Sequence, residues 1–142
     1  MSLYLDTSAL VKLLVDEPGT DEAKQAYADA DGVRTTAIAQ VEATSALTRM
    51  RKGGRLTPKQ LGHGVDDLES LWRGLYVHAV DNELLARAAE SARAHALRAY
   101  DAVHLASALS FATGETLEFA CWDKELRGAA KKHGFALVPE QL

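Results

Sequence analysis

The stretch "LYLDTSALVKLL", residues 3–14, opens the chain with a short apolar run followed by an acid and two hydroxyl residues. Leu3–Leu5 predicts a buried strand, and Ala9–Leu14 predicts the start of a helix. Asp6, between them, has two interpretations. As a helix cap, it accepts hydrogen bonds from the free N–H groups of the first turn. As a functional acid, it lies at the carboxyl end of a strand, where α/β sheets bind ligands.

Length and composition are those of a globular protein with one domain, which we expect to span residues 1–142. Hydrophobic residues make up 47% of the chain and charged residues 25%. We find neither an apolar run of membrane-spanning length nor a signal peptide, and therefore expect a cytoplasmic protein with no membrane partner. The single cysteine, Cys121, excludes an internal disulfide and a cysteine-cluster zinc site.

The net charge of −4 argues against a broad nucleic-acid-binding coat, which is normally basic. A local basic run, "RMRKGGR" at residues 49–55, contains Arg49, Arg51 and Lys52. Cations followed by two glycines are typical of a helix C-terminus. Contact with a nucleic-acid substrate is the alternative interpretation, and it is compatible with the first.

Short β-like runs alternate with helical patterns along the whole chain. This alternation predicts an α/β fold with a mostly parallel central sheet flanked by helices. The expected strands are Leu3–Leu5, Val33–Thr36, Leu75–Val80, Leu117–Cys121 and Ala136–Val138, and the expected helices lie at about 8–15, 21–30, 37–52, 57–73, 82–97, 100–113 and 124–132.

Three of the expected strands are followed by an aspartate: Asp6, Asp81 and Asp123. If the strand order is 3-2-1-4-5, the first and fourth strands are neighbours beside the point where the order reverses. Ligands bind at such a point, whereas the third strand would be an edge. Position therefore separates Asp6 and Asp123 from Asp81, which we interpret as a plain cap.

Two further acids lie on expected helices. Asp101, in "AYDAVHLASALSFA" (residues 99–112), shares a helical face with apolar residues, where an unpaired charge is costly. The dipole at a helix N-terminus stabilises an acid there but does not explain an inward-facing one. Glu42, in "AIAQVEATSALTRM" (residues 37–50), lies at the border of an apolar arc, where a glutamate is usually solvated. Its small neighbours allow other segments to approach closely.

Taken together, the four acids predict a metal site. Carboxylates gathered within a few ångströms repel each other, so such a cluster is costly without a cation. An all-oxygen cluster is what Mg²⁺ or Mn²⁺ prefers. None of the five histidines is at metal-ligand spacing, and we assign them no role.

Four segments in this order resemble the PIN-domain ribonucleases, and among them the VapC toxins of toxin–antitoxin pairs. They are "YLDTSALVKL", the glutamate in "QVEATSAL", "RAYDAVHLASAL" and "FACWDKEL". The resemblance covers essentially the whole chain. It implies a PIN-like three-layer fold with strand order 3-2-1-4-5 and a metal-dependent endoribonuclease site.

The resemblance also implies roles for individual residues. The catalytic and metal-binding acids correspond to Asp6, Glu42, Asp101 and Asp123, and the family's hydroxyl position corresponds to Ser8. Thr7 or Ser8 would hydrogen-bond a ligand carboxylate or water. The expected reaction is hydrolysis of RNA by water activated on Mg²⁺ or Mn²⁺, which leaves a 5′-phosphate and a 3′-hydroxyl. The expected partners are a small antitoxin of VapB type and a second copy of the chain.

Three other functions share part of this pattern. A haloacid-dehalogenase-type phosphatase also uses a strand-end aspartate and Mg²⁺, but it needs a second aspartate two residues later, where this chain has Ser8. A phospho-receiver domain needs an early acidic pair and an aspartate near mid-chain. The third alternative is a PIN-like module that binds RNA or a partner without cutting, and cleavage that depends on added metal would distinguish it.

Overall fold

Five parallel strands form a single sheet in the computed structural model, which describes residues 1–142. The strand order is β3-β2-β1-β4-β5, which confirms the predicted α/β class and order. The strands are β1 (Ser2–Leu5), β2 (Val33–Thr36), β3 (Tyr76–His78), β4 (Leu117–Ala120) and β5 (Ala136–Val138). The helices are α1 (Thr7–Lys12), α2 (Thr20–Asp29), α3 (Ile38–Lys52), α4 (Pro58–Trp72), α5 (Asn82–His95), α6 (Ala99–Ala112) and α7 (Lys124–Lys132).

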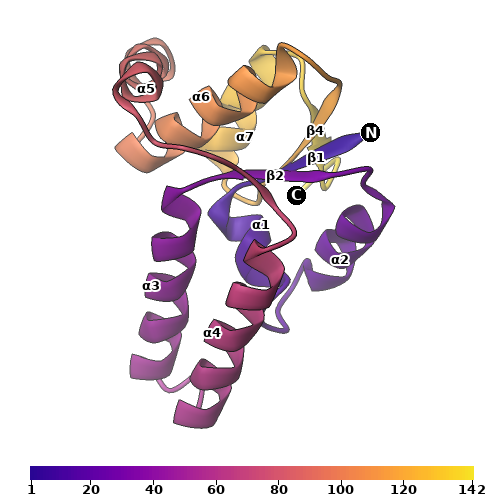
Figure 1. Ribbon diagram of the computed structural model, residues 1–142, viewed down its shortest axis with the longest axis vertical. Coiled ribbons are helices and arrows are strands. Elements are labelled where there is room, and N and C mark those ends of the chain that lie inside the picture. Colours follow the sequence, from indigo (N-terminus) through magenta and orange to yellow (C-terminus); the bar gives the residue numbers. More distant parts are fainter.

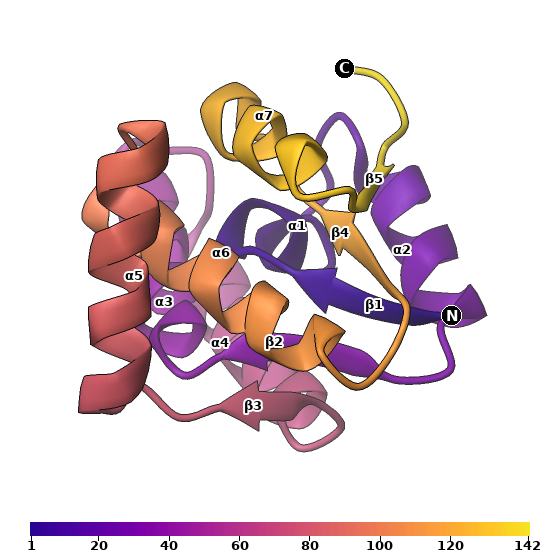
Figure 2. The same cartoon turned by 90° about the horizontal axis from the view of Figure 1, so that it is seen from above.

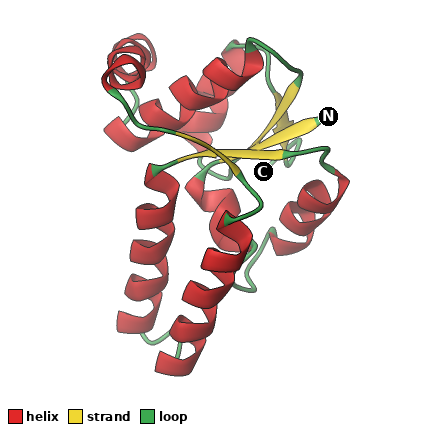
Figure 3. Ribbon diagram, viewed as in Figure 1, coloured by secondary structure: helices red, strands yellow, loops and turns green.

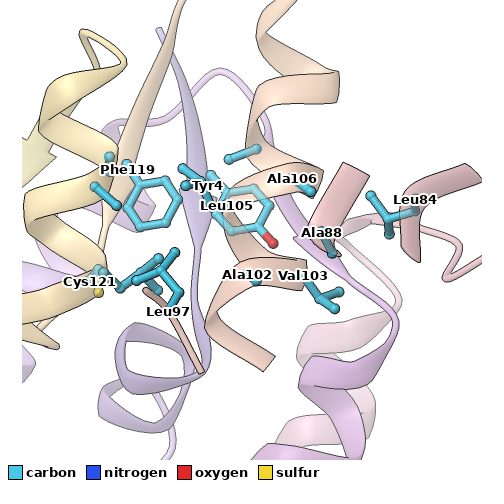
Figure 4. Close-up of a cluster of buried hydrophobic side chains, with 14 of the residues drawn as sticks. Tyr4, Leu84, Ala88, Leu97, Ala102, Val103, Leu105, Ala106, Phe119 and Cys121 are labelled. Carbon is cyan, nitrogen blue, oxygen red and sulfur yellow. The ribbon is translucent and has the colours of Figure 1, made fainter. Parts of the chain in front are cut away.

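Helices cover both faces of the sheet and make three layers (Figures 1 and 3). Helices α5, α6 and α7 lie over one face, and α1 to α4 lie over the other (Figures 1 and 2). Because successive strand residues point to opposite faces, the central strand β1 serves both cores. Tyr4 packs with α5, α6, α7 and β4 (Figure 4), whereas Leu3 and Leu5 pack with α1 and α3.

Helices α3 and α4 project together from one end of the sheet as an antiparallel pair (Figure 1). Their close approach depends on Gly64, because a Cβ atom there would lie 3.2 Å from Cδ1 of Leu47. Thr57 and Gln60 form a reciprocal capping box at the start of α4, where each side chain bonds the other's backbone N–H. No helix of the chain combines the length and the apolarity that crossing a membrane requires.

The predicted elements differ from the observed ones mainly at their ends. β3 is shorter than the predicted strand Leu75–Val80, because its only neighbour, β2, ends at Thr36, which pairs with His78. Helix α5 ends at His95 rather than at residue 97, because Ala96 adopts the left-handed conformation with φ 53°. The turn after Ala96 leads directly into α6.

Candidate active site

The carboxyl ends of β1 and β4 lie side by side, since Leu5 pairs with Ala120 in a parallel register. From these neighbouring ends the chain continues into Asp6 on one side and toward Asp123 on the other. β2 lies on the other side of β1, so the two connections diverge at this point. Such a switch point is the usual ligand-binding position of an open parallel sheet.

Asp6 is a buried carboxylate that caps α1. Only 3% of the residue is exposed, and its Oδ1 accepts hydrogen bonds from the Ala9 N–H at 2.9 Å and the Ser8 hydroxyl at 2.7 Å. Ser8 in turn accepts a hydrogen bond from the Trp122 N–H, which ties the end of β1 to the segment after β4. Burial raises the pKa of Asp6. The charge of His104 and hydrogen bonds from Cys121, Ser8 and Ala9 oppose the rise without cancelling it.

Asp101 and Asp123 share one cation. The guanidinium of Arg98, the residue before α6, lies 3.1 Å from an oxygen of Asp101 and 3.1 Å from an oxygen of Asp123. Asp123 also caps α7, because its Oδ1 accepts from the Leu126 N–H at 2.9 Å. Nη2 of Arg98 therefore bridges two of the four predicted acids.

Repulsion between the acids persists despite Arg98. Burial and the charge of Asp123 raise the pKa of Asp101, with a smaller contribution from Asp6, and Arg98 only partly offsets them. The guanidinium is largely exposed, so its attraction is screened by water. Asp6, Asp101 and Asp123 thus form an electrostatically coupled group that is short of positive charge.

Glu42 lies in a separate, well-satisfied network around His104. Its Oε1 accepts from the Thr7 hydroxyl at 2.7 Å and from Nε2 of His104 at 2.8 Å. The other ring nitrogen of His104, Nδ1, lies 3.0 Å from the hydroxyl of Tyr4. Nε2 of His104 also lies 3.1 Å from the Thr7 hydroxyl, so both ring nitrogens have polar partners.

The prediction that no histidine has a role is therefore wrong for His104. The residue is only 1% exposed and holds the carboxylate of Glu42. Burial alone would raise the pKa of Glu42, but the hydrogen bond and charge of His104, together with the Thr7 hydroxyl, outweigh burial and lower it. Glu42 is thus a half-buried, stabilised carboxylate rather than the solvated border residue of the alternative interpretation.

A groove of about 480 Å³ opens beside this network. Thr7 and Glu42 line its inner part, and Arg49, together with the exposed side chains of Val41 and Tyr100, lines its outer part. Arg51 and Lys52 are exposed and line no part of the groove. The structure therefore brings one of the three predicted basic residues to the acids.

The acidic group provides donors suited to a hard divalent cation. No group of three or more carboxylate, imidazole or thiol side chains in residues 1–142 is arranged to hold a metal ion by itself. Mg²⁺, however, commonly uses one or two carboxylates and keeps several waters. The raised pKa values of Asp6 and Asp101 indicate the missing positive charge that such an ion would supply. The residues present therefore fit Mg²⁺ or Mn²⁺.

Cysteine chemistry is not available here. Cys121 is buried, and burial together with the charge of Asp6 raises its pKa far above the usual range. The thiol therefore remains neutral and is a poor nucleophile.

Sequence reasoning missed two residues of the site, Arg98 and His104. Each lies three residues from Asp101 in the sequence, but this spacing alone does not identify the partners of either residue. Asp81, in contrast, is the plain cap that was predicted: its Oδ1 accepts from the Leu84 N–H at 2.8 Å, at the edge strand of the sheet.

The chain is similar to known proteins over most of its length. Residues 3–114 match the family described as PIN domain. Ribonuclease VapC45 of Mycobacterium tuberculosis (strain CDC 1551 / Oshkosh) is 36% identical over 141 residues, covering 99% of this chain and 96% of the relative.

Two solved structures share the fold. A toxin–antitoxin complex from Klebsiella pneumoniae contains a chain that aligns with a TM-score of 0.66 and 19% identity, covering 90% of this chain and 92% of that chain. VapC20 of Mycobacterium tuberculosis, described as a sarcin–ricin loop cleaving toxin, aligns with a TM-score of 0.69 and 20% identity, covering 94% and 95%. At these identities the likeness concerns the fold.

The contact between Glu42 and His104 predicts a measurable coupling free energy. In a double-mutant cycle of Glu42→Ala and His104→Ala, urea unfolding should give a coupling of about 1–3 kcal/mol, because the hydrogen bond is charge-assisted and sheltered. Since the pKa of Glu42 is lowered, this stability is present above its unfolded pKa and is lost as pH falls through the folded pKa. The exposed pair Glu83 and Arg87 is the matched control, with an expected coupling below about 0.5 kcal/mol. Equal coupling in both cycles would contradict this description.

Asp101→Asn should stabilise the metal-free protein at neutral pH. Because the folded pKa of Asp101 is raised, its ionised form costs stability: the cost is absent below the unfolded pKa of about 3.9 and complete above the folded pKa. Thermal unfolding in EDTA at pH 7.5 should show a Tm higher by about 2–4 °C, the effect of about 1 kcal/mol in a domain of this size. The difference should vanish below about pH 4. A variant that melts lower than wild type at pH 7.5 would mean that the bond to Arg98 dominates instead.

Proposed function

The chain belongs to the PIN-domain family, and on this premise we propose that it is a divalent-metal-dependent endoribonuclease, the toxin of a toxin–antitoxin pair. One observation carries the proposal. Asp6, at the switch point of the sheet, and Asp101, whose pKa the charge of Asp6 helps to raise, both have raised pKa values and are short of positive charge. A group of this kind costs folding stability and is retained where a cation and its chemistry repay the cost.

In this proposal Asp6 and Asp101 hold Mg²⁺ or Mn²⁺, and Asp123 contributes directly or through a water. Glu42 holds a second ion or orients the attacking water. When bound, the metal supplies a water of lowered pKa and polarises a phosphoryl oxygen. The products would be a 5′-phosphate and a 3′-hydroxyl, as the resemblance to the family implies.

The surrounding residues position these acids. The Ser8 hydroxyl and the Ala9 N–H both bond Oδ1 of Asp6 and so fix the orientation of the carboxylate. Thr7 and His104 hold Glu42 in its ionised form, which suits a group that must accept a hydrogen bond from water. Arg98, which is exposed and already beside Asp101 and Asp123, is placed to pair with a phosphate when substrate arrives.

RNA would enter along the groove beside Glu42. Arg49, on the groove wall, offers a charge for a phosphate, and the exposed ring of Tyr100 offers a surface on which a base can stack. Arg51 and Lys52 lie outside the groove and would contribute at most at longer range. A narrow basic wall of this kind is compatible with the net charge of −4.

An antitoxin partner of VapB type is part of the proposal. The toxin–antitoxin complex from Klebsiella pneumoniae, which shares this fold, supports it. A homodimer is also proposed, on the resemblance to the VapC toxins.

Asp6→Asn and Asp101→Asn should each reduce RNA cleavage by more than about 100-fold, beyond what the loss of an outer partner of a metal ligand costs. The amide keeps the shape of the side chain but cannot supply the charge. Cleavage of a labelled RNA by the purified variants tests this, with circular dichroism as the folding control. Asp81→Asn, at an equivalent cap on the edge strand, should retain activity. Near-wild-type cleavage by either site variant would overturn the assignment of that residue as a metal ligand. No cleavage by wild type with added Mg²⁺ or Mn²⁺ would favour the PIN-like module that binds without cutting.

Activity should require Mg²⁺ or Mn²⁺, disappear in EDTA, and be supported weakly or not at all by Ca²⁺. The larger and more flexible coordination shell of Ca²⁺ binds carboxylates but fixes the reacting geometry poorly. The test measures initial cleavage rates at equal concentrations of each ion after EDTA treatment. Full activity in EDTA would remove the metal from the proposal and point to metal-free acid–base cleavage.

A further inference from the structure

Two histidines that the proposed reaction does not use meet on the side of the molecule formed by α5 and α7. His95 is the last residue of α5, and His133 follows α7 directly. Their Nε2 atoms lie 2.9 Å apart, and their rings are 5.0 Å apart with an interplanar angle of 73°. The two residues are 38 positions apart in the sequence, so the fold alone brings them together.

The distance between the two nitrogens is close to that of two ligands on one metal ion. Imidazole nitrogens bind such ions at about 2.0–2.1 Å, so two of them at a right angle lie about 2.9 Å apart, and at a tetrahedral angle about 3.4 Å apart. The same pair can share one proton in a hydrogen bond, but only if one ring accepts and the other donates. Rotation of the rings from one arrangement to the other requires little movement.

The surroundings leave room for an ion and its water. A groove of about 360 Å³ is lined by both histidines, and Glu90 also lines it. Glu125 lines a second hollow on the other side of His95. Partial burial and the charges of His133 and Lys132 lower the pKa of His95, which keeps this ring neutral and able to coordinate at neutral pH.

We propose that His95 and His133 together bind one divalent transition-metal ion of the class that prefers imidazole, such as Ni²⁺, Cu²⁺ or Zn²⁺, with water at the remaining positions. Ligand type separates this site from the acidic one, since imidazole suits these ions and carboxylates suit Mg²⁺ and Mn²⁺. The proposal does not depend on the proposed ribonuclease activity.

Binding of the metal ion would join helices α5 and α7, which are connected mainly through their contacts with α6. Helices α5 and α7 both pack on α6 (Figure 2). An ion held by the end of α5 and the end of α7 would cross-link them over α6. It would also restrain the turn at Ala96 and Leu97, which leads to Arg98 and Asp101. The main expected effect is a more stable folded state.

Titration of Ni²⁺ into the untagged protein tests the proposal, by calorimetry at pH 7.5 with millimolar Mg²⁺ present to occupy the acidic group. Wild type should bind one Ni²⁺ per chain at the histidine pair. His95→Gln and His133→Gln should each weaken that binding at least 10-fold. The exposed His63 provides the matched control, and His63→Gln should bind like wild type. Asp101→Asn should also bind like wild type, which shows that the ion is not at the acidic group.

Thermal unfolding gives a second readout. At a free Ni²⁺ concentration about 100 times the Kd, the Tm of wild type should rise by about 5–10 °C, and the Tm of the two histidine variants should not rise. Without metal, both variants should melt close to wild type, because neither side chain is part of the core. The proposal is overturned if wild type binds no Ni²⁺, if the His95 and His133 variants bind as tightly as wild type, or if His63→Gln loses as much affinity.

Discussion

The structure depends on the burial of one carboxylate at the end of its central strand. β1 packs on both faces, so the chain leaves the sheet from the middle of the hydrophobic core, and Asp6 is its first residue outside the strand. A carboxylate placed there loses most of its hydration. The hydrogen bonds from Ser8 and Ala9 compensate only in part, as the raised pKa shows. The proposed cation would relieve the remaining cost.

The protein stabilises the ionised form of one site acid, Glu42, and destabilises the ionised form of another, Asp101. Glu42 is stabilised as an ion, because His104 and Thr7 hold it and its pKa is lowered. Asp101 is destabilised as an ion, because burial and Asp123 raise its pKa. One carboxylate is therefore already complete within the protein, whereas the other is completed only by an added cation. This division supports a positioning role for Glu42 and a ligand role for Asp101.

The alternation of strands and helices could be predicted from periodicity, and the positions of Asp6 and Asp123 from where strands end. The strand order and the role of Glu42 rested on the resemblance to the PIN-domain ribonucleases. Neither His104 nor Arg98 could be assigned in the same way. Helix α6 is buried over most of its central turns, so its apolar residues do not define a single buried face. The helical pattern therefore cannot tell that His104 points toward Glu42. Arg98 follows the turn at Ala96, and the left-handed conformation of Ala96 could not be predicted from the sequence pattern.

Capping and ligand binding, which looked like alternatives for a strand-end aspartate, are compatible because a carboxylate has two oxygens. Asp6, Asp81 and Asp123 all cap a helix, and in each the cap uses Oδ1. The surroundings of the second oxygen, Oδ2, differ among the three. Oδ2 of Asp123 accepts a hydrogen bond from Arg98, whereas Ser8 and Ala9 donate to Oδ1 of Asp6 and not to its Oδ2. Asp81 follows the edge strand β3, away from the switch point. The cap therefore orients the carboxylate, and the topology of the sheet decides whether the second oxygen meets other acids or only solvent.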